Sequence, residues 1–423
     1  LERTDRYDSA ARLYQRIVDD IGKRKGKDPE EQKQLDRILA NAHFRLAYNA
    51  NRFFDFDRAV ENYRVLVDSP RFAKSEDANI RDQRQDALVN SGIILERLQQ
   101  YPRAAEYYKR AAETVADPDI KRRSYYRLAE MQYKQRNWGG TVTAMQDFIR
   151  RYDRDPAAGE LIVQAQWRIA EARKEQGKTR EYKQALQSVA DSFARSGQPA
   201  GSVAAEYAAE AKFRLADEGM ADFEKFAVKP GRPKSLDIYV KNVTSQIEKG
   251  SQDAKRLTES YAQVPGYRRP KWTIAAYVRQ GRAYEVLARS VLDTPFVMPD
   301  DMQKQLKRVG PDQREEVRVQ VEDRIRAVLD ERVRPIECRA VARYALASRA
   351  ARAGSIDNEY TRQAADRLQA YGEERIAECI AEAQKEDSTF QAYKPGEFSR
   401  APRGRSIRMT DGTAPPSLPR EGR

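Results

Sequence analysis

Residues 91–111 have the sequence SGIILERLQQYPRAAEYYKRA. The stretch holds a pair of small residues and then aromatic and small residues at helical intervals: Ser91-Gly92, Tyr101, Ala104, Tyr108 and Ala111. A small residue on one helix that faces a small residue on the next allows two antiparallel helices to pack closely, and aromatic rings fill the gaps beside them. The pattern predicts a hairpin of two helices.

The same spacing recurs along the first half of the chain. The spacing is an aromatic residue, then a small residue three positions later, an aromatic one at seven and an apolar one at ten, and the copy that starts at Trp138 is weaker. The copies are Tyr7, Ala10, Tyr14, Ile17; Phe56, Ala59, Tyr63, Leu66; Trp138, Thr141, Met145, Phe148; and, more faintly, Thr179, Tyr182, Leu186, Val189. Pairs that end in a small residue precede the later copies: Leu46-Ala47, Leu128-Ala129 and Ile169-Ala170. A recurring hairpin predicts an all-α array of stacked hairpins.

These residues resemble the tetratricopeptide repeat over residues 1–195, with Gly92, Tyr101, Ala104, Tyr108 and Ala111 matching best. The resemblance implies a right-handed superhelical solenoid of helix-turn-helix repeats with a concave groove for protein segments. The intervals of 45, 37 and 41 residues from Ala59 to Ala104, Thr141 and Tyr182 exceed the family's usual length of about 34. We therefore expect longer helices or loops than usual.

The composition supports a helical array and disfavours several classes of protein, among them membrane-spanning proteins and enzymes. The 423 residues carry a net charge of +13, with 40% hydrophobic and 34% charged residues, which suits amphipathic helices with much surface. No apolar run is long enough for a membrane helix. The chain has none of the motifs GxSxG, P-loop, HExxH or CxxC, so we predict no enzyme activity, no cofactor and no small-molecule substrate.

Few residues suit a metal site or a disulfide. His43 is the single histidine, and no other ligand type clusters with it, so we predict a packing role and no metal. Cys338 and Cys379 fall on helices predicted at 336–353 and 358–386. A simple hairpin of these helices would displace the two cysteines by about 9 Å along the axis, so we predict buried free thiols.

The second half, residues 196–389, predicts longer, degenerate hairpins that continue the solenoid. We expect helices at 204–217, 220–228, 235–263, from Pro270 onward and at 313–333, the last cut at Pro335. This half is similar to the C-terminal part of large tetratricopeptide-repeat proteins of the myxobacterial gliding-motility type. The similar residues are Tyr277–Ala288, Thr294-Pro295, Met298-Pro299 and Asn358-Glu359-Tyr360-Thr361. The resemblance implies a periplasmic or envelope-associated scaffold of bacterial origin, against the alternative of a cytoplasmic one.

The last stretch, residues 390–423, holds five Pro and four Gly, with seven basic and three acidic residues. Such a stretch buries too little apolar surface to offset its ordering entropy, so we expect a flexible basic tail. The alternative is a strap docked on a partner or on its own solenoid.

The tetratricopeptide resemblance implies that certain positions on the first helix of each hairpin line the groove. Those positions hold Phe44, Tyr48, Asn51, Arg52, Val89, Ile93, Arg97, Tyr126, Tyr133, Lys134, Trp167, Glu171 and Lys174. Aromatic residues mixed with basic ones are typical of protein interfaces. The alternative for Phe44 and Tyr126 is packing against the adjacent repeat. The Lys/Asn set with which chaperone adaptors bind a terminal carboxylate is not reproduced at these positions.

We therefore predict a non-catalytic scaffold within a multiprotein cell-envelope complex, with a motility role as one setting. It binds peptide or helix segments of proteins, and its N-terminal end stacks on upstream repeats or a second copy. The alternative function is a nucleic-acid-associated adaptor that uses the tail and two basic patches, Lys121-Arg122-Arg123 and Arg268-Arg269 with Lys271. Nucleic acid is disfavoured because most basic residues alternate with acids.

Overall fold

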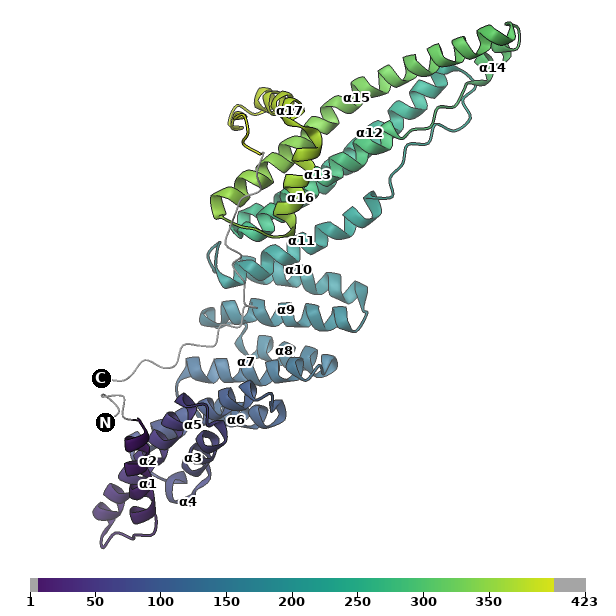
Figure 1. Cartoon of the computed structure of the whole chain (residues 1–423). Helices are drawn as coiled ribbons and strands as arrows, with labels where there is room; N and C mark the ends of the chain where they lie inside the picture. The colour runs from purple at the N-terminus through teal and green to yellow at the C-terminus, as the bar shows by residue number, and fades with distance from the viewer. Residues whose placement is uncertain (1–6, 399–423) are drawn as a thin grey trace. The chain divides into compact units, whose positions relative to one another are not determined.

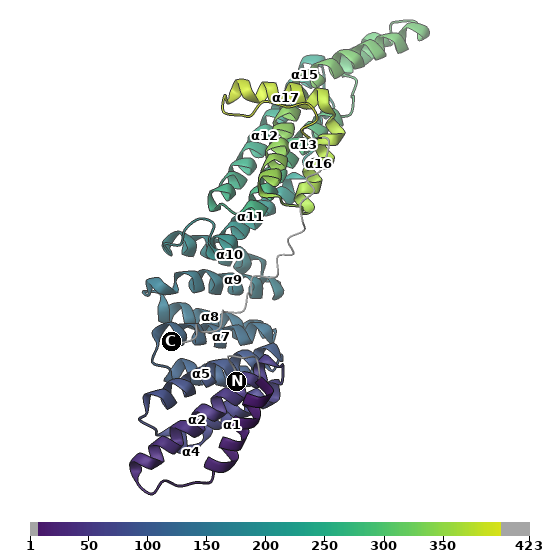
Figure 2. The ribbon, with the colours of Figure 1, turned by 60° about the vertical axis from the view of Figure 1, so that its left-hand side comes forward.

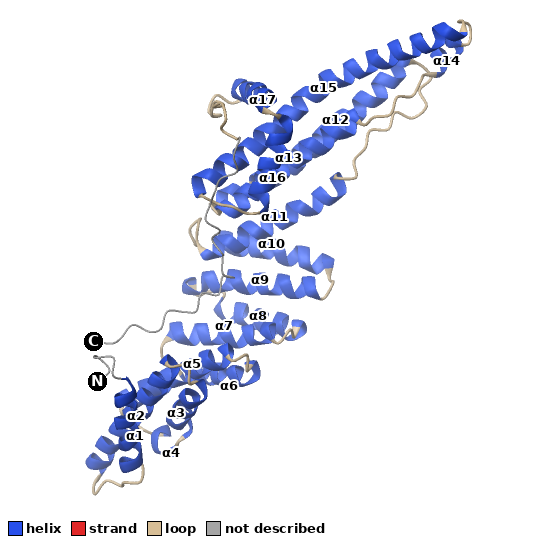
Figure 3. Ribbon diagram, viewed as in Figure 1, coloured by secondary structure: helices blue, strands red, loops and turns tan. Residues whose placement is uncertain are grey.

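The computed structural model describes residues 7–398, and every regular element in that range is helical (Figure 3). Contacts divide the chain into two units, which meet between Ala185 and Leu186. The division falls inside one helix. The prediction of an all-α solenoid of helical repeats is confirmed.

The first unit is a row of helices, and from α1 to α9 each longer helix packs on the next one (Figures 1 and 2). Its elements are α1 (Tyr7–Ile21), α2 (Pro29–Arg52), α3 (Phe56–Asp68), α4 (Pro70–Ala73), α5 (Ala78–Arg97), α6 (Tyr101–Thr114), α7 (Pro118–Lys134), α8 (Trp138–Tyr152), η2 (Pro156–Ala158), α9 (Gly159–Glu175) and α10 (Thr179–Arg195). Asp28 and Asp117 begin α2 and α7 as N-caps, each followed by a proline at the first helical position.

The recurring residues form the core of this unit. Ala104 and Tyr108 are 0% and 1% exposed, and the same holds for Ala59 and Tyr63 one repeat earlier. A Cβ at Gly92 would lie 2.7 Å from the Tyr108 ring, so only glycine allows α5 and α6 to approach this closely. The repeated spacing thus reports which residues face each other across the hairpins.

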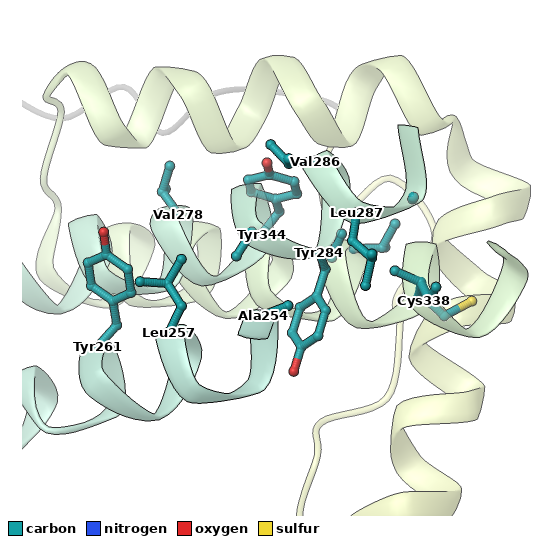
Figure 4. Packing of buried hydrophobic residues seen from close by; sticks show 14 of the residues in the cluster. Ala254, Leu257, Tyr261, Val278, Tyr284, Val286, Leu287, Cys338 and Tyr344 are labelled. Carbon is teal, nitrogen blue, oxygen red and sulfur yellow. The ribbon is translucent and has the colours of Figure 1, made fainter. Parts of the chain in front are cut away.

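The second unit is built on long helices, of which α12, α13 and α15 run side by side (Figures 1 and 2). Its elements after α10 are α11 (Val203–Phe223), α12 (Leu236–Ala262), η3 (Val264–Tyr267), α13 (Pro270–Leu292), α14 (Asp300–Leu306), α15 (Pro311–Gly354), α16 (Glu359–Tyr371) and α17 (Glu373–Glu386). Figure 4 shows its centre, where Tyr261, Tyr344 and Leu287 lie among small residues such as Ala254.

Two predicted helix boundaries in this unit are wrong. Helix α15 continues through Pro335, where we expected a break. Pro335 has no amide hydrogen, so the carbonyl of Glu331 loses its helical donor. Both residues are exposed, and water can therefore hydrate that carbonyl. Helices expected at 204–217 and 220–228 are the single helix α11, because Met220 and Phe223 extend its buried stripe.

The prediction of two free thiols is also wrong, because Cys338 and Cys379 form a disulfide with a Cα–Cα distance of 4.5 Å. We expected one helix over 358–386, but Gly372, with φ of 78°, separates α16 from α17. The turn brings α17 back onto α15, where Arg375 pairs with Glu337 at 2.7 Å. A glycine in the left-handed region therefore places the second cysteine beside the first.

The start of the expected tail is packed on α15. Arg349 pairs with Glu397 at 2.8 Å and donates to the Gln391 carbonyl at 2.9 Å, and Phe398 is 7% exposed. Residues 390–398 thus match the strap alternative, while the rest of the tail, residues 399–423, lies outside the described residues.

Candidate protein-interaction face

We call the side of α2, α5, α7 and α9 that carries the predicted groove residues the first-helix face. Its members differ in exposure. Arg52, Arg97 and Lys174 are exposed, whereas Phe44, Tyr48, Asn51, Val89, Ile93, Tyr133, Lys134 and Glu171 are half-buried. Tyr126 and Trp167 are only 5% and 4% exposed, so both belong to the packing between helices. Phe44 lies edge-on to Tyr63 at 5.7 Å between ring centroids, which is the packing role considered for it.

A carboxylate on α5 gathers partners from two other helices. Glu96 accepts hydrogen bonds from the Tyr108 hydroxyl at 2.6 Å and from the Lys134 ammonium at 2.5 Å. The Arg127 guanidinium lies 3.1 Å away. Burial alone would raise the pKa of Glu96, but Arg127, Lys134 and Tyr108 outweigh it and the pKa is lowered. Glu96 is therefore charged at neutral pH and joins α5, α6 and α7.

A second carboxylate repeats the arrangement one helix further. Glu130 on α7 has a side chain only 3% exposed and pairs with Arg127 at 3.2 Å and with Arg168 of α9 at 3.1 Å. Arg168 also pairs with Glu171 at 2.8 Å and lies over the Tyr133 ring at 4.4 Å from its centroid. Burial would lower the pKa of Arg168, but the surrounding negative groups raise it, so the cation is permanent.

The two clusters form a line of alternating charges across α5, α7 and α9. Of the predicted residues, the line includes Tyr133, Lys134 and Glu171. Sequence reasoning missed Glu96, Arg127, Glu130, Arg168 and the role of the Tyr108 hydroxyl. A signal was present, since Arg127 and Arg168 each stand immediately before a predicted small-residue pair, with a glutamate three positions later. Paired and partly buried charges hold successive first helices in register. The half-buried side chains among them, Tyr133, Lys134 and Glu171, keep some surface that a partner can contact.

His43 is 8% exposed, and its Nδ1 lies 3.0 Å from the Asn62 Oδ1. Burial lowers the pKa of His43, and the hydrogen bond that its Nδ1 donates to the Asn62 Oδ1 only partly offsets this, so the imidazole is neutral at neutral pH. Within residues 7–398, no cluster of three or more metal-ligating side chains occurs. In the same range, no helix combines the length and apolar character needed to cross a bilayer.

The fold is that of a helical-repeat protein assembled from hairpins. Comparison with protein families places the Tetratricopeptide repeat at residues 123–154 and 164–196. The first segment spans α7 and α8 and the second spans α9 and α10. The comparison therefore identifies tetratricopeptide repeats in these two segments of the chain. No curated protein matches it by sequence.

Two solved structures are similar to the chain. The apo form of RapI has 11% identity, and the alignment covers 73% of this chain and 99% of RapI with a TM-score of 0.33. A circular tandem repeat protein with novel repeat topology and enhanced subunit contact surfaces has 15% identity, coverage of 90% and 86%, and a TM-score of 0.19. At these TM-scores neither likeness bears on the function of this chain.

Proposed function

We propose that the protein is a non-catalytic scaffold that binds segments of partner proteins on its first-helix face. The observation that supports this most directly is the line from Glu96 to Glu171, where fixed charges lie beside half-buried aromatic and aliphatic side chains. Rigid apolar area supplies affinity and fixed charges supply orientation, so this surface suits a helix or peptide with its own charged residues.

A charge-reversal experiment tests the face. Arg97→Glu with Lys174→Glu reverses two exposed charges on α5 and α9 without entering the core. The control, Lys109→Glu with Arg154→Glu, makes the same change of charge at exposed positions of α6 and the α8–η2 link. Affinity purification should show partners lost from the first variant and kept by the control. Equal partner sets in both variants would assign binding to another surface.

Tyr126 and Trp167 are unsuitable test sites because both are buried. Their replacement by alanine would remove core contacts at a cost of about 3–5 kcal/mol, so lost binding would report lost folding. Tyr133→Ala removes a half-buried ring and is the better aromatic variant.

We further propose that the scaffold works in an oxidising compartment of the cell envelope, such as the periplasm. The support is the buried Cys338–Cys379 disulfide, since such bonds persist mainly outside the reducing cytosol. Alkylation of free thiols in intact native cells tests this. Both cysteines should resist the reagent until a reductant is added, and rapid labelling would place the chain in a reducing compartment. A motility complex is one setting, and its support is the resemblance of residues 277–361.

A further inference from the structure

The turn between the two helices of a hairpin has the same backbone in four successive repeats. Its second residue has a positive φ each time, at Phe54 (61°), Gln99 (58°), Arg136 (56°) and Gly177 (69°). The hydrogen bonds repeat as well. The amide of Phe54 donates to the carbonyl three residues before it, and the next amide, of Asp55, donates to the carbonyl of Ala50. The other three turns show the same pair of bonds. The fold therefore requires a left-handed residue here but does not require phenylalanine.

Phenylalanine is an unfavourable choice at this position. A bulky side chain is rarely found with positive φ, where glycine and asparagine are favoured. Phe54 is also 79% exposed and its neighbour Phe53 is 56% exposed, while Phe56 meets the Phe54 ring edge-on at 6.0 Å. Strained and exposed aromatic residues that a fold does not need indicate a contact surface. We call residues 53–57 the Phe loop.

A groove of about 740 Å³ in the second unit suits this loop. It lies between α12 and the first half of α15, and its apolar lining residues include Val240, Ile325, Val328 and Leu329. Val328 is 36% exposed. Tyr239 also lines the groove, and its buried hydroxyl has no hydrogen-bond partner among residues 7–398. An apolar groove of this size can take one or two phenylalanine rings.

The charges beside the two surfaces are complementary. The charged residues of the Phe loop are two carboxylates, Asp55 and Asp57, which both follow Phe54, while Arg58, just beyond the loop, is already hydrogen-bonded to Gln15. Lys241, Arg324 and Arg332 line the groove, and none of these three has an ion pair within the described part of the chain. Two acids lie there too, Asp237 and Glu248, yet the unpaired excess is basic.

We propose that the Phe loop of one copy of this protein binds the α12–α15 groove of a second copy. The contact joins different surfaces of the two copies, so it is heterologous and adds copies head to tail. This proposal concerns self-assembly and does not rest on partner binding by the first-helix face.

A mixing experiment with two full-length variants tests it. Phe54→Asn removes the donor ring at a position where asparagine suits the backbone, and Val328→Asp places a charge in the acceptor groove. Sedimentation over a range of concentrations should show association of the wild type. Each variant alone should lose association by about tenfold or more in dissociation constant, as loss of a central anchor residue does.

The mixture of the two variants is the decisive sample. One intact groove and one intact loop remain, so the mixture should form dimers and nothing larger. Val319→Asp, at a position on α15 that is 44% exposed but outside the groove lining, should associate like the wild type. Gln99→Asn is the matched control for the turn. Circular dichroism shows that each variant is folded.

Three results would overturn the proposal. They are a wild type that sediments as a monomer throughout, a mixture that stays monomeric, and loss of association in the Val319→Asp control. An exposed aromatic loop can also bind a membrane, and cosedimentation with phosphatidylcholine–phosphatidylglycerol vesicles tests this. Vesicle binding lost in Phe54→Asn, without any self-association, would make the loop a membrane contact instead. The Arg97→Glu, Lys174→Glu variant should still self-associate, which separates this proposal from partner binding.

Discussion

Two parts of the molecule, one in each unit, hold a tyrosine over a glycine in the same way. In α5–α6–α7 the Tyr108 ring lies against Gly92, where a Cβ would be 2.7 Å away, and the Tyr108 hydroxyl donates to Glu96. In α13–α15–α16 the Tyr344 ring lies against Gly281, where a Cβ would be 2.8 Å away. The Tyr344 hydroxyl donates to Glu285 at 3.0 Å.

The agreement extends to the third helix. Glu96 pairs with Arg127 of α7 at 3.1 Å, and Glu285 pairs with Arg367 of α16 at 3.2 Å. In both places the glutamate follows the glycine by four residues, which places both on one helix face. We call each set of glycine, tyrosine, glutamate and arginine a tyrosine clamp.

The difference between the two clamps is their spacing in sequence. Tyr108 follows Gly92 by 16 residues, whereas Tyr344 follows Gly281 by 63, with α14 and the first half of α15 between them. The contacts are nevertheless the same because they join side chains across helices, and a long insertion does not change which faces meet. The comparison shows that a repeat can persist as a packing unit after its sequence period is lost.

Replacement of each clamp tyrosine by alanine is expected to have the largest effect. Tyr108→Ala and Tyr344→Ala should each destabilise their own unit by about 3–5 kcal/mol, because both rings are 1% exposed. Hydrogen exchange measured by mass spectrometry should show faster exchange in α5–α7 for the first and in α13–α16 for the second. If one variant loosened both units equally, the clamps would not be local. Tyrosine-to-phenylalanine variants, which lose only the hydroxyl, are the controls, at about 1–3 kcal/mol.

Loss of the disulfide should distinguish the units. Only the second carries a covalent link among the described residues, and its removal typically costs about 2–4 kcal/mol. Reductant should therefore speed exchange in α15 and α17 but leave α5–α9 unchanged. Cys338→Ser with Cys379→Ser should reproduce the change and abolish the response to reductant. A response in α5–α9 would contradict the independence of the units.

Alanine at the clamp glycines should have an intermediate effect. Gly92→Ala and Gly281→Ala each push a methyl group into a buried ring, for about 1–3 kcal/mol of destabilisation. Denaturant unfolding of both variants measures this. Gly139→Ala, at a helical position with nothing within 4 Å of the added Cβ, is the control and should be neutral or stabilising.

The smallest expected effect is a pH dependence of the first clamp. The folded-state pKa of Glu96 is lowered below its usual value of 4.5. Its contribution to stability is therefore complete above that value and is lost as the pH falls through the lowered pKa. The free-energy difference between wild type and Glu96→Gln should shrink as the pH falls below about 4.5. A difference that stayed constant with pH would show that the charge of Glu96 is unimportant.

Sequence alone predicted what depends on local periodicity. Ala59, Ala104 and Tyr108 recur at helical intervals because one helix face must be buried, and that rule requires no knowledge of partners. The groove positions followed from the family resemblance and stay a prediction, while Tyr133, Lys134 and Glu171 take part in the line of charges across α5, α7 and α9.

Only the tertiary structure decided which distant residues meet. In the sequence, Arg127 and Arg168 cannot be told from ordinary surface charges. The structure shows that they pair with Glu96 and Glu130 on neighbouring helices. Cys379 reaches Cys338 because a single glycine, Gly372, turns the chain, and no periodicity encodes that turn. Periodicity reports the face of a helix that is buried, whereas the direction of each turn and the length of each insertion determine what lies against it.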